Sequence, residues 1–183
     1  MASVFAHAIV GAALWPLFRD EGAPKNTWLV GAGLAALPDI DVLAFRFGVA
    51  YGDLFGHRGI THSLLAAVVI GTLAALAYAR GPSASRFRLR LAAYFVVAMA
   101  SHGILDAMTT GGLGVAFFAP FDNSRYFFPW RPIAVSPIGV RPFFTARGRA
   151  VLANELAWVE LPAIALACLG LFARRVMSER RVS

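Results

Sequence analysis

Five apolar segments joined by polar connections are the feature that most limits what this chain can fold into. Charged residues make up only 15% of it and hydrophobic residues 58%, whereas soluble domains contain about 25% charged residues. The chain therefore belongs in a lipid bilayer. The segments predict an all-α membrane protein, a bundle of about five helices.

The segments fall into two length classes. Crossing a hydrocarbon layer of ~30 Å takes roughly 17–25 helical residues. Three segments are long enough: 60–79, 89–107 and 151–172. Two shorter ones, 3–18 and 27–38, are joined by a charged turn that should reach water. We therefore expect a tight N-terminal helical hairpin plus three spans, forming a single domain over residues 1–175 with a basic tail at 176–183.

The distribution of arginine indicates the orientation. Arginines concentrate in the connection 80–90 and in the C-terminal tail, and the positive-inside tendency places both in the cytoplasm. Two spans separate the connection from the tail, so both segments can lie on the same side of the membrane. The outer side then receives 39–59 and 108–150. The second of these is rich in aromatic residues and arginine, and we expect it to lie along the outer membrane surface.

The charge and cysteine content exclude other classes of protein. The formal net charge is +7, and Lys25 is the only lysine among 17 basic residues. The arginines lie between apolar segments, where topology accounts for them, so nucleic-acid binding is not expected. Cys168 is the single cysteine, which excludes a disulfide or a thiolate metal site. Residues 1–5 lack the basic region of a cleavable signal, so none is expected.

All four histidines lie near acidic or hydroxyl residues at the edges of apolar segments. Ionisable groups at the edge of a membrane are unfavourable and therefore indicate function. The orientation given by the arginines is independent of the histidines, and it places them at the outer ends of the helices beside several carboxylates. These residue types bind divalent metals. The candidate ligands are His7, Asp39, Asp41, His57, His62, His102 and Asp106.

Spacing separates these candidates. His102 and Asp106 stand at i and i+4 on one helical face. In an apolar span Asp106 needs a partner to offset its desolvation, and a structural His–Asp hydrogen bond is the alternative to a metal site. Pro38 is expected to end the second segment. Asp39 is then the better candidate ligand, whereas Asp41 either holds a histidine in place or forms an ordinary cap.

The third span opens with the sequence GHRGITHS. Its glycines permit a bent backbone, and Thr61 or Ser63 can cap the helix. The helix N-terminus should favour neutral His62, which is the form that binds metal. His57 can ligate the same ion or act as an acid or base. Arg58 suits an oxyanion or phosphate, although a lone arginine here would be topological.

Four further residues depend on the tertiary arrangement. His7 is a candidate ligand only because the hairpin is expected to bring it near Asp39. Thr109 and Thr110 follow the helix of His102, where their hydroxyls can contact a substrate. Glu155 falls at the outer start of the last span, where it can serve as a ligand or general acid or simply pack against a partner helix.

In these motifs the chain resembles the YdjM family of predicted membrane-bound, metal-dependent hydrolases. The resemblance covers about residues 1–172. It rests on His7, on PDID at 38–41, on HRGITHS at 57–63, and on Ser101 through Asp106 with Thr109 and Gly111. It implies a multi-pass protein of a prokaryotic cytoplasmic (inner) membrane.

A weaker similarity exists to secreted zinc-dependent phospholipases C. That similarity implies zinc, with manganese possible. Those enzymes have further histidines after the HxxxD helix, whereas His102 is the last histidine of this chain. One or two metal ions are therefore expected rather than three.

The leading hypothesis is a membrane-embedded metal-dependent hydrolase that cleaves a phosphoester of a lipid or lipid-linked substrate at the outer face by metal-activated water. His57, Arg58 and Glu155 are the candidate catalytic residues, and Arg58, Thr109 and Thr110 the candidate substrate contacts. The alternative is a non-catalytic metal-binding protein: a transporter, a sensor or a metal-stapled structural protein. Transport is disfavoured because the inner halves of the spans contain almost no polar groups.

Overall fold

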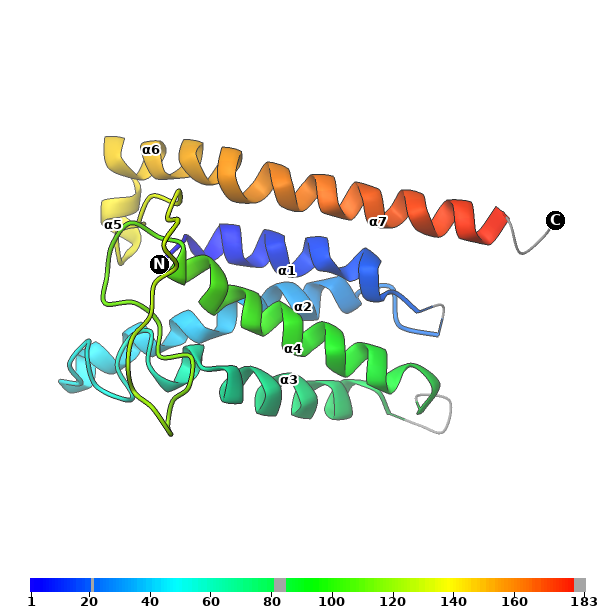
Figure 1. Ribbon diagram of the computed structural model, residues 1–183, viewed down its shortest axis with the longest axis horizontal. Coiled ribbons are helices and arrows are strands. Elements are labelled where there is room, and N and C mark those ends of the chain that lie inside the picture. Colours follow the sequence, from blue (N-terminus) through cyan, green and yellow to red (C-terminus); the bar gives the residue numbers. More distant parts are fainter. Residues whose placement is uncertain (21, 81–84, 180–183) are drawn as a thin grey trace.

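Helical rods make up the molecule in the computed structural model, which describes residues 1–20, 22–80 and 85–179 (Figure 1). The five rods are α1 (Val4–Phe18), α2 (Thr27–Ala36) continued by η1 (Leu37–Phe47), α3 (Leu64–Tyr78), α4 (Ser85–Ala107), and a last rod of α6 (Ala146–Glu155), η4 (Leu156–Glu160) and α7 (Leu161–Glu179). Two short helices, η2 (Ile60–His62) and α5 (Val140–Phe143), lie in connections. The described residues contain isolated bridges but no strand. The prediction of an all-α bundle of about five helices is confirmed.

Helix α4 is the central element and contacts α1, α2 and α3 (Figure 1). Small residues let the helices approach closely. A Cβ added at Gly31 would lie 1.9 Å from the hydroxyl oxygen of Tyr94, and this hydroxyl donates to Gly11 O at 2.8 Å. The predicted α1–α2 hairpin is thereby held against α4. The start of α1 and the end of α4 lie together at one end of the bundle.

The second apolar segment is longer than predicted. Pro38 does not end it, because α2 passes at Leu37 into η1 and the helical stretch Thr27–Phe47 has 21 residues. A proline is tolerated in the first turn of the new helix, where its missing N–H removes no hydrogen bond that the helix needs. Asp39 and Asp41 therefore lie within a helix rather than beyond one.

The third segment is shorter than predicted. A separate turn, η2, precedes α3, and the Ser63 hydroxyl caps α3 by accepting from Ala66 N at 3.0 Å. Helix α3 consequently has 15 residues, which is fewer than a full crossing requires. Three described helices are long and apolar enough to cross a membrane: Thr27–Phe47, Phe87–Ala107 and Ala146–Glu179. The last of these includes residues 176–179 of the predicted tail, while 180–183 lie outside the described residues.

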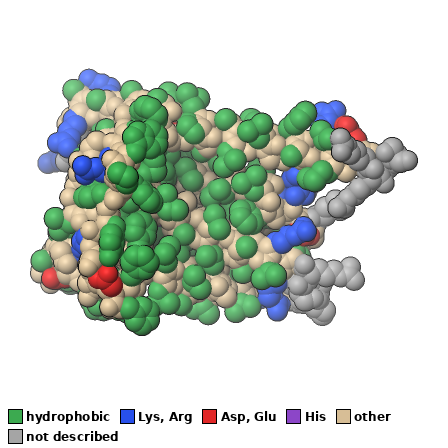
Figure 2. Space-filling model, viewed as in Figure 1, with side chains coloured by type: hydrophobic (Ala, Val, Ile, Leu, Met, Phe, Trp, Pro, Cys, Tyr) green, Lys and Arg blue, Asp and Glu red, His purple; other side chains and the backbone are tan. Residues whose placement is uncertain are grey.

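The surface agrees with a membrane location. On the face shown in Figure 2, hydrophobic side chains spread over the middle of the molecule, and lysine and arginine gather at its two ends. Large apolar side chains on three rods, such as Leu29, Leu73 and Leu169, are more than half exposed. These side chains are left exposed by the described residues, as expected of surfaces that face lipid.

Two long connections meet at the end of the bundle where α1 starts. The first joins η1 to α3 and the second joins α4 to α5. They are hydrogen-bonded to each other, since Ala116 N donates to Arg58 O at 3.0 Å, and the second also bonds the start of α3, where Leu64 N donates to Phe117 O at 2.9 Å. The position of the second connection along the membrane surface stays a prediction.

Candidate metal centre

Four of the predicted ligands converge where these connections cover the helices. They are Asp39 of η1, His62 of η2, and His102 and Asp106 of α4. One ligand atom from each lies within 4.8 Å of the others, and all four side chains are buried. The helical spacing of His102 and Asp106 brings two of them to one face of α4. The other two reach the same point through tertiary packing.

The separations between the ligand atoms suit a single ion. His62 Nε2 and His102 Nε2 are 3.0 Å apart, and Asp39 Oδ1 lies 3.8 Å and 3.3 Å from them. Asp106 Oδ2 is 3.6 Å from His62 Nε2 and 3.9 Å from His102 Nε2. A tetrahedral zinc ion with ligands at about 2.0–2.1 Å holds its ligand atoms about 3.3–3.4 Å apart. The observed separations bracket that value.

Both imidazoles are held with Nε2 toward the cluster. His102 Nδ1 lies 2.7 Å from Ala35 O, and because a carbonyl only accepts, Nδ1 carries the proton and Nε2 a lone pair. His62 Nδ1 lies 3.2 Å from Asp41 Oδ2, a carboxylate that acts in the same way. Metal-binding histidines characteristically donate their second ring N–H to a carbonyl or carboxylate.

Asp41 lies beside the four-residue cluster rather than in it. Its carboxylate contacts His57 Nδ1 at 2.7 Å and accepts from Thr61 Oγ1 at 2.7 Å and from Arg58 N at 3.2 Å. Together with His57 and His62 it forms a second buried group whose ligand atoms are close enough to hold an ion. Its existing bonds indicate that it orients the two histidines.

Asp39 provides the fit test for a cation. Both of its carboxylate oxygens are buried and have no hydrogen-bond donor among the described residues. An unpartnered buried carboxylate is strongly unfavourable, and it persists where a charge of opposite sign can bind. The donor set of two imidazoles and two carboxylates therefore fits a divalent metal such as zinc.

His62 shows the same attraction for positive charge. It lies in the connection between the second and third rods. Burial lowers the pKa of its imidazole, but the attraction of the nearby carboxylates of Asp106, Asp39 and Asp41 outweighs burial and raises this pKa to about 10. The carboxylates, rather than the start of α3, therefore dominate the electrostatics of this ring. They favour either a proton or a metal ion here.

Arg58 is completely buried and already bonded. Its Nε lies 3.0 Å from Asp106 Oδ2, while Nη1 donates to Gly111 O at 3.0 Å and Nη2 to Thr109 Oγ1 at 2.9 Å. Its backbone φ is 64°, in the left-handed region that residues other than glycine seldom adopt. The unusual backbone directs this side chain inward, where it compensates the charge of Asp106.

The remaining predicted residues are divided. His7 borders the cluster: its ring stacks on His102 with centroids 3.6 Å apart, and its Nε2 lies 3.4 Å from Asp106 Oδ1. Glu155 bonds instead to Ser3, whose hydroxyl donates to Glu155 Oε2 at 2.6 Å, and so ties the last rod to α1. Thr110 is exposed, and its hydroxyl accepts from Val135 N.

Arg125 is a residue of the site that was not among the predicted ones. Its guanidinium donates to His57 O at 2.9 Å, to Asp53 O at 3.0 Å and to Tyr51 O at 3.3 Å. It thereby clamps the connection that carries His57 and Arg58. Nothing in the sequence distinguishes it from the neighbouring arginines, because its partners are backbone carbonyls, which every residue has.

Together, the exposed apolar rods and the buried histidine–aspartate cluster define a helical integral membrane protein with a candidate metal centre. The YdjM inner membrane protein family matches residues 1–180, and the chain belongs to that family. It is also similar to the inner membrane protein YbcI of Escherichia coli (strain K12). The two are 40% identical over 166 residues, which cover 91% of this chain and 95% of that protein. No solved structure is detectably similar.

Proposed function

We propose that this protein is a membrane-embedded metal-dependent hydrolase acting on a phosphoester of a lipid or lipid-linked substrate. The observation that carries the proposal is Asp39, whose two unpartnered oxygens lie buried beside the Nε2 atoms of His62 and His102. A buried carboxylate left without donors in this way is the arrangement expected of a metal ligand.

The four-residue cluster of Asp39, His62, His102 and Asp106 would hold one ion. Imidazole and carboxylate ligands suit zinc first and manganese second. When bound, such an ion lowers the pKa of a water ligand to about 7 and polarises a phosphoryl oxygen. We favour one ion over two because the Asp41 carboxylate already has three partners.

His57 is proposed as the acid or base. Its Nδ1 is held by Asp41 at 2.7 Å, while its Nε2 is buried without a hydrogen-bond partner among the described residues. Its ring centroid is 5.3 Å from that of His62. A histidine fixed through Nδ1 by a carboxylate presents Nε2 to accept a proton, the arrangement used in many hydrolases.

Arg58 is proposed to neutralise Asp106 and to orient the phosphate. A guanidinium has five N–H donors, and Nη1 and Nη2 of Arg58 each use one in a hydrogen bond, so each keeps a second N–H, while Nε is ion-paired with Asp106. Thr109 would position the guanidinium rather than the substrate. The connections that cover the cluster expose aromatic side chains, among them Phe55 and Phe121, which suit a lipid interface.

One observation favours a second candidate function. Every residue of the cluster is at most 8% exposed, so an ion there would also tie η1, η2 and α4 together. A non-catalytic metal-binding protein, with the ion as a structural staple, explains this burial. It gives no role to the free Nε2 of His57.

The test compares metal content and turnover in detergent-purified protein prepared without chelator. His102→Ala should lose metal and activity, whereas His57→Gln should keep metal and lose hydrolysis of phospholipid or isoprenyl-phosphate substrates. Wild-type protein that holds metal but turns over none of these substrates would favour the staple. Wild-type protein that binds neither added zinc nor added manganese would contradict both candidate functions.

A further inference from the structure

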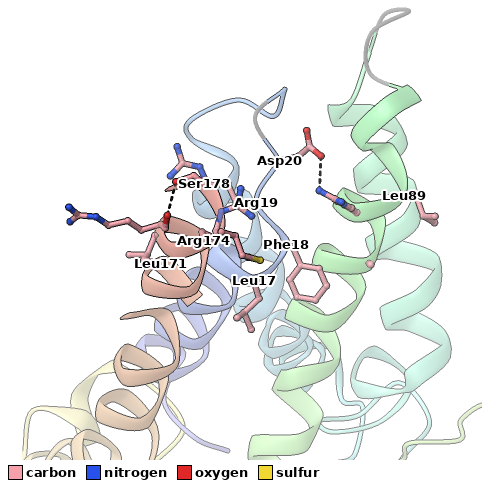
Figure 3. A pocket seen from close by; sticks show the side chains of 12 residues that line it. Leu17, Phe18, Arg19, Asp20, Leu89, Leu171, Arg174 and Ser178 are labelled. Carbon is pink, nitrogen blue, oxygen red and sulfur yellow. Dashed lines mark hydrogen bonds and ion pairs between the residues drawn. The ribbon is translucent and has the colours of Figure 1, made fainter. Parts of the chain in front are cut away.

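A large cavity lies at the other end of the bundle from the histidine cluster (Figure 3). Its volume is about 1200 Å³, and it lies between the last turn of α1, the beginning of α4 and the end of α7. Along α4, Arg90 at the cavity precedes His102 by 12 residues, which corresponds to about 18 Å of helix. The two sites are therefore separate.

Apolar and polar residues line different depths of the cavity. Leu17, Phe18 and Leu171 lie deeper along the helices, and polar side chains lie toward the end of the bundle (Figure 3). The order of residues explains this division, since Arg19 directly follows α1, and Arg174 and Arg175 follow the apolar part of α7. A ligand here would meet hydrocarbon at one end and positive charge at the other.

Four arginines supply the positive charge: Arg19, Arg90, Arg174 and Arg175. Arg90 pairs with Asp20 at 3.1 Å and Arg175 with Glu179 at 3.1 Å, and both arginine side chains are largely exposed. Arg19 and Arg174 have no ion pair or side-chain hydrogen bond with any described residue, although Arg174 is only half-exposed. The cavity therefore has a surplus of donors suited to an anion.

We propose that this cavity binds the headgroup of an anionic phospholipid from the leaflet at this end of the protein. Guanidinium groups match phosphate oxygens in geometry, and basic pockets between membrane helices are suited to acidic headgroups. The acyl chains would run along the exposed side chains of Leu17, Leu89 and Leu171. The arginine distribution assigns this leaflet to the cytoplasmic side. The site is independent of the proposed hydrolase function.

The experiment compares phosphatidylglycerol with phosphatidylcholine by lipid retention in native mass spectrometry of the detergent-purified protein. Wild-type protein should retain phosphatidylglycerol preferentially. The double substitution Arg19→Gln with Arg174→Gln, which removes no ion pair between described residues, should weaken its retention about tenfold or more. The matched control, Arg147→Gln with Arg149→Gln, removes the same charge from exposed positions on α6 and should retain it like wild type.

Three results would overturn the proposal. Equal retention of the two lipids by wild-type protein needs no variant and would exclude headgroup recognition. Equal losses in the variant and in the control would show a response to net charge rather than a site. Displacement of phosphatidylglycerol by millimolar inorganic phosphate would identify a site for free anions. An unchanged melting temperature in each variant would confirm that the comparison is made between folded proteins.

Discussion

The two ends of this protein use charge in opposite ways. At the histidine end the ionisable side chains are buried in contact with one another, and the carboxylate of Asp39 has no hydrogen-bond donor among the described residues. At the arginine end the ion pairs between described residues, Arg90–Asp20 and Arg175–Glu179, are at least partly exposed, and they leave Arg19 and Arg174 without an acidic partner among those residues. The interaction energy between buried charges is large and depends strongly on their geometry. Solvent and salt screen the interactions between exposed charges, which therefore depend less on geometry. The first arrangement suits a rigid metal centre and the second a mobile lipid.

The largest effect should come from Arg58→Met. This change leaves the Asp106 carboxylate buried without its arginine, and breaking such a pair typically costs about 3–5 kcal/mol of unfolding free energy. The melting temperature in detergent, measured with chelator so that bound metal does not contribute, should fall sharply. Arg174→Met at the other end should change stability by no more than about 0.5 kcal/mol. Equal losses in both variants would contradict the contrast between the ends.

His102→Ala removes a ligand and should come next. Loss of a residue that contacts the metal directly should weaken metal binding strongly. The loss should exceed the roughly 10–100-fold that is typical for a residue that only hydrogen-bonds to a ligand. The measurement is zinc affinity from competition with a chelator of known affinity. His7→Ala is the control, because His7 stacks on His102 but lies outside the four-atom set. Metal binding that depends on His7 as strongly as on His102 would require a different ligand set.

Asp41→Asn should have an intermediate effect. The amide keeps the shape but cannot accept from both histidines as a carboxylate does, so zinc affinity should fall roughly 10–100-fold. The same titration measures it. A loss as complete as that of Asp39→Asn would mean that Asp41 is itself a ligand and that the second buried group holds the ion.

The smallest effect is expected for Arg90→Gln. The Arg90–Asp20 pair is exposed, with 66% of the arginine side chain accessible, and exposed pairs contribute about 0.2–1 kcal/mol. Thermal unfolding in detergent at low and high salt should show a small difference that disappears with salt. A large, salt-independent loss would place this pair among the structural contacts of the fold and weaken the distinction between the ends.

Local pattern predicted much of the candidate site. The spacing of His102 and Asp106 placed both on one helical face, and the arginine distribution grouped the histidines at one end. Convergence of Asp39 and His62 on that face was expected only as a consequence of topology. Pro38 was misjudged because a proline signals a helix end and a helix start equally well. Arg58 was expected to face a substrate, whereas the structure buries it against Asp106. This burial depends on a left-handed backbone at Arg58, which the residue type does not predict.

By itself, the sequence determined that this is a helical membrane protein with metal-binding residue types at one end, because hydropathy and helical period are local properties. Only the tertiary structure decided which side chains meet. His102 Nδ1 bonds Ala35 O, 67 residues away, and so presents Nε2 to His62 and Asp39. Such contacts depend on how closely α2 approaches α4, which Gly31 and Tyr94 set by packing. Distances of a few tenths of an ångström, which distinguish a ligand from a neighbour, arise only there.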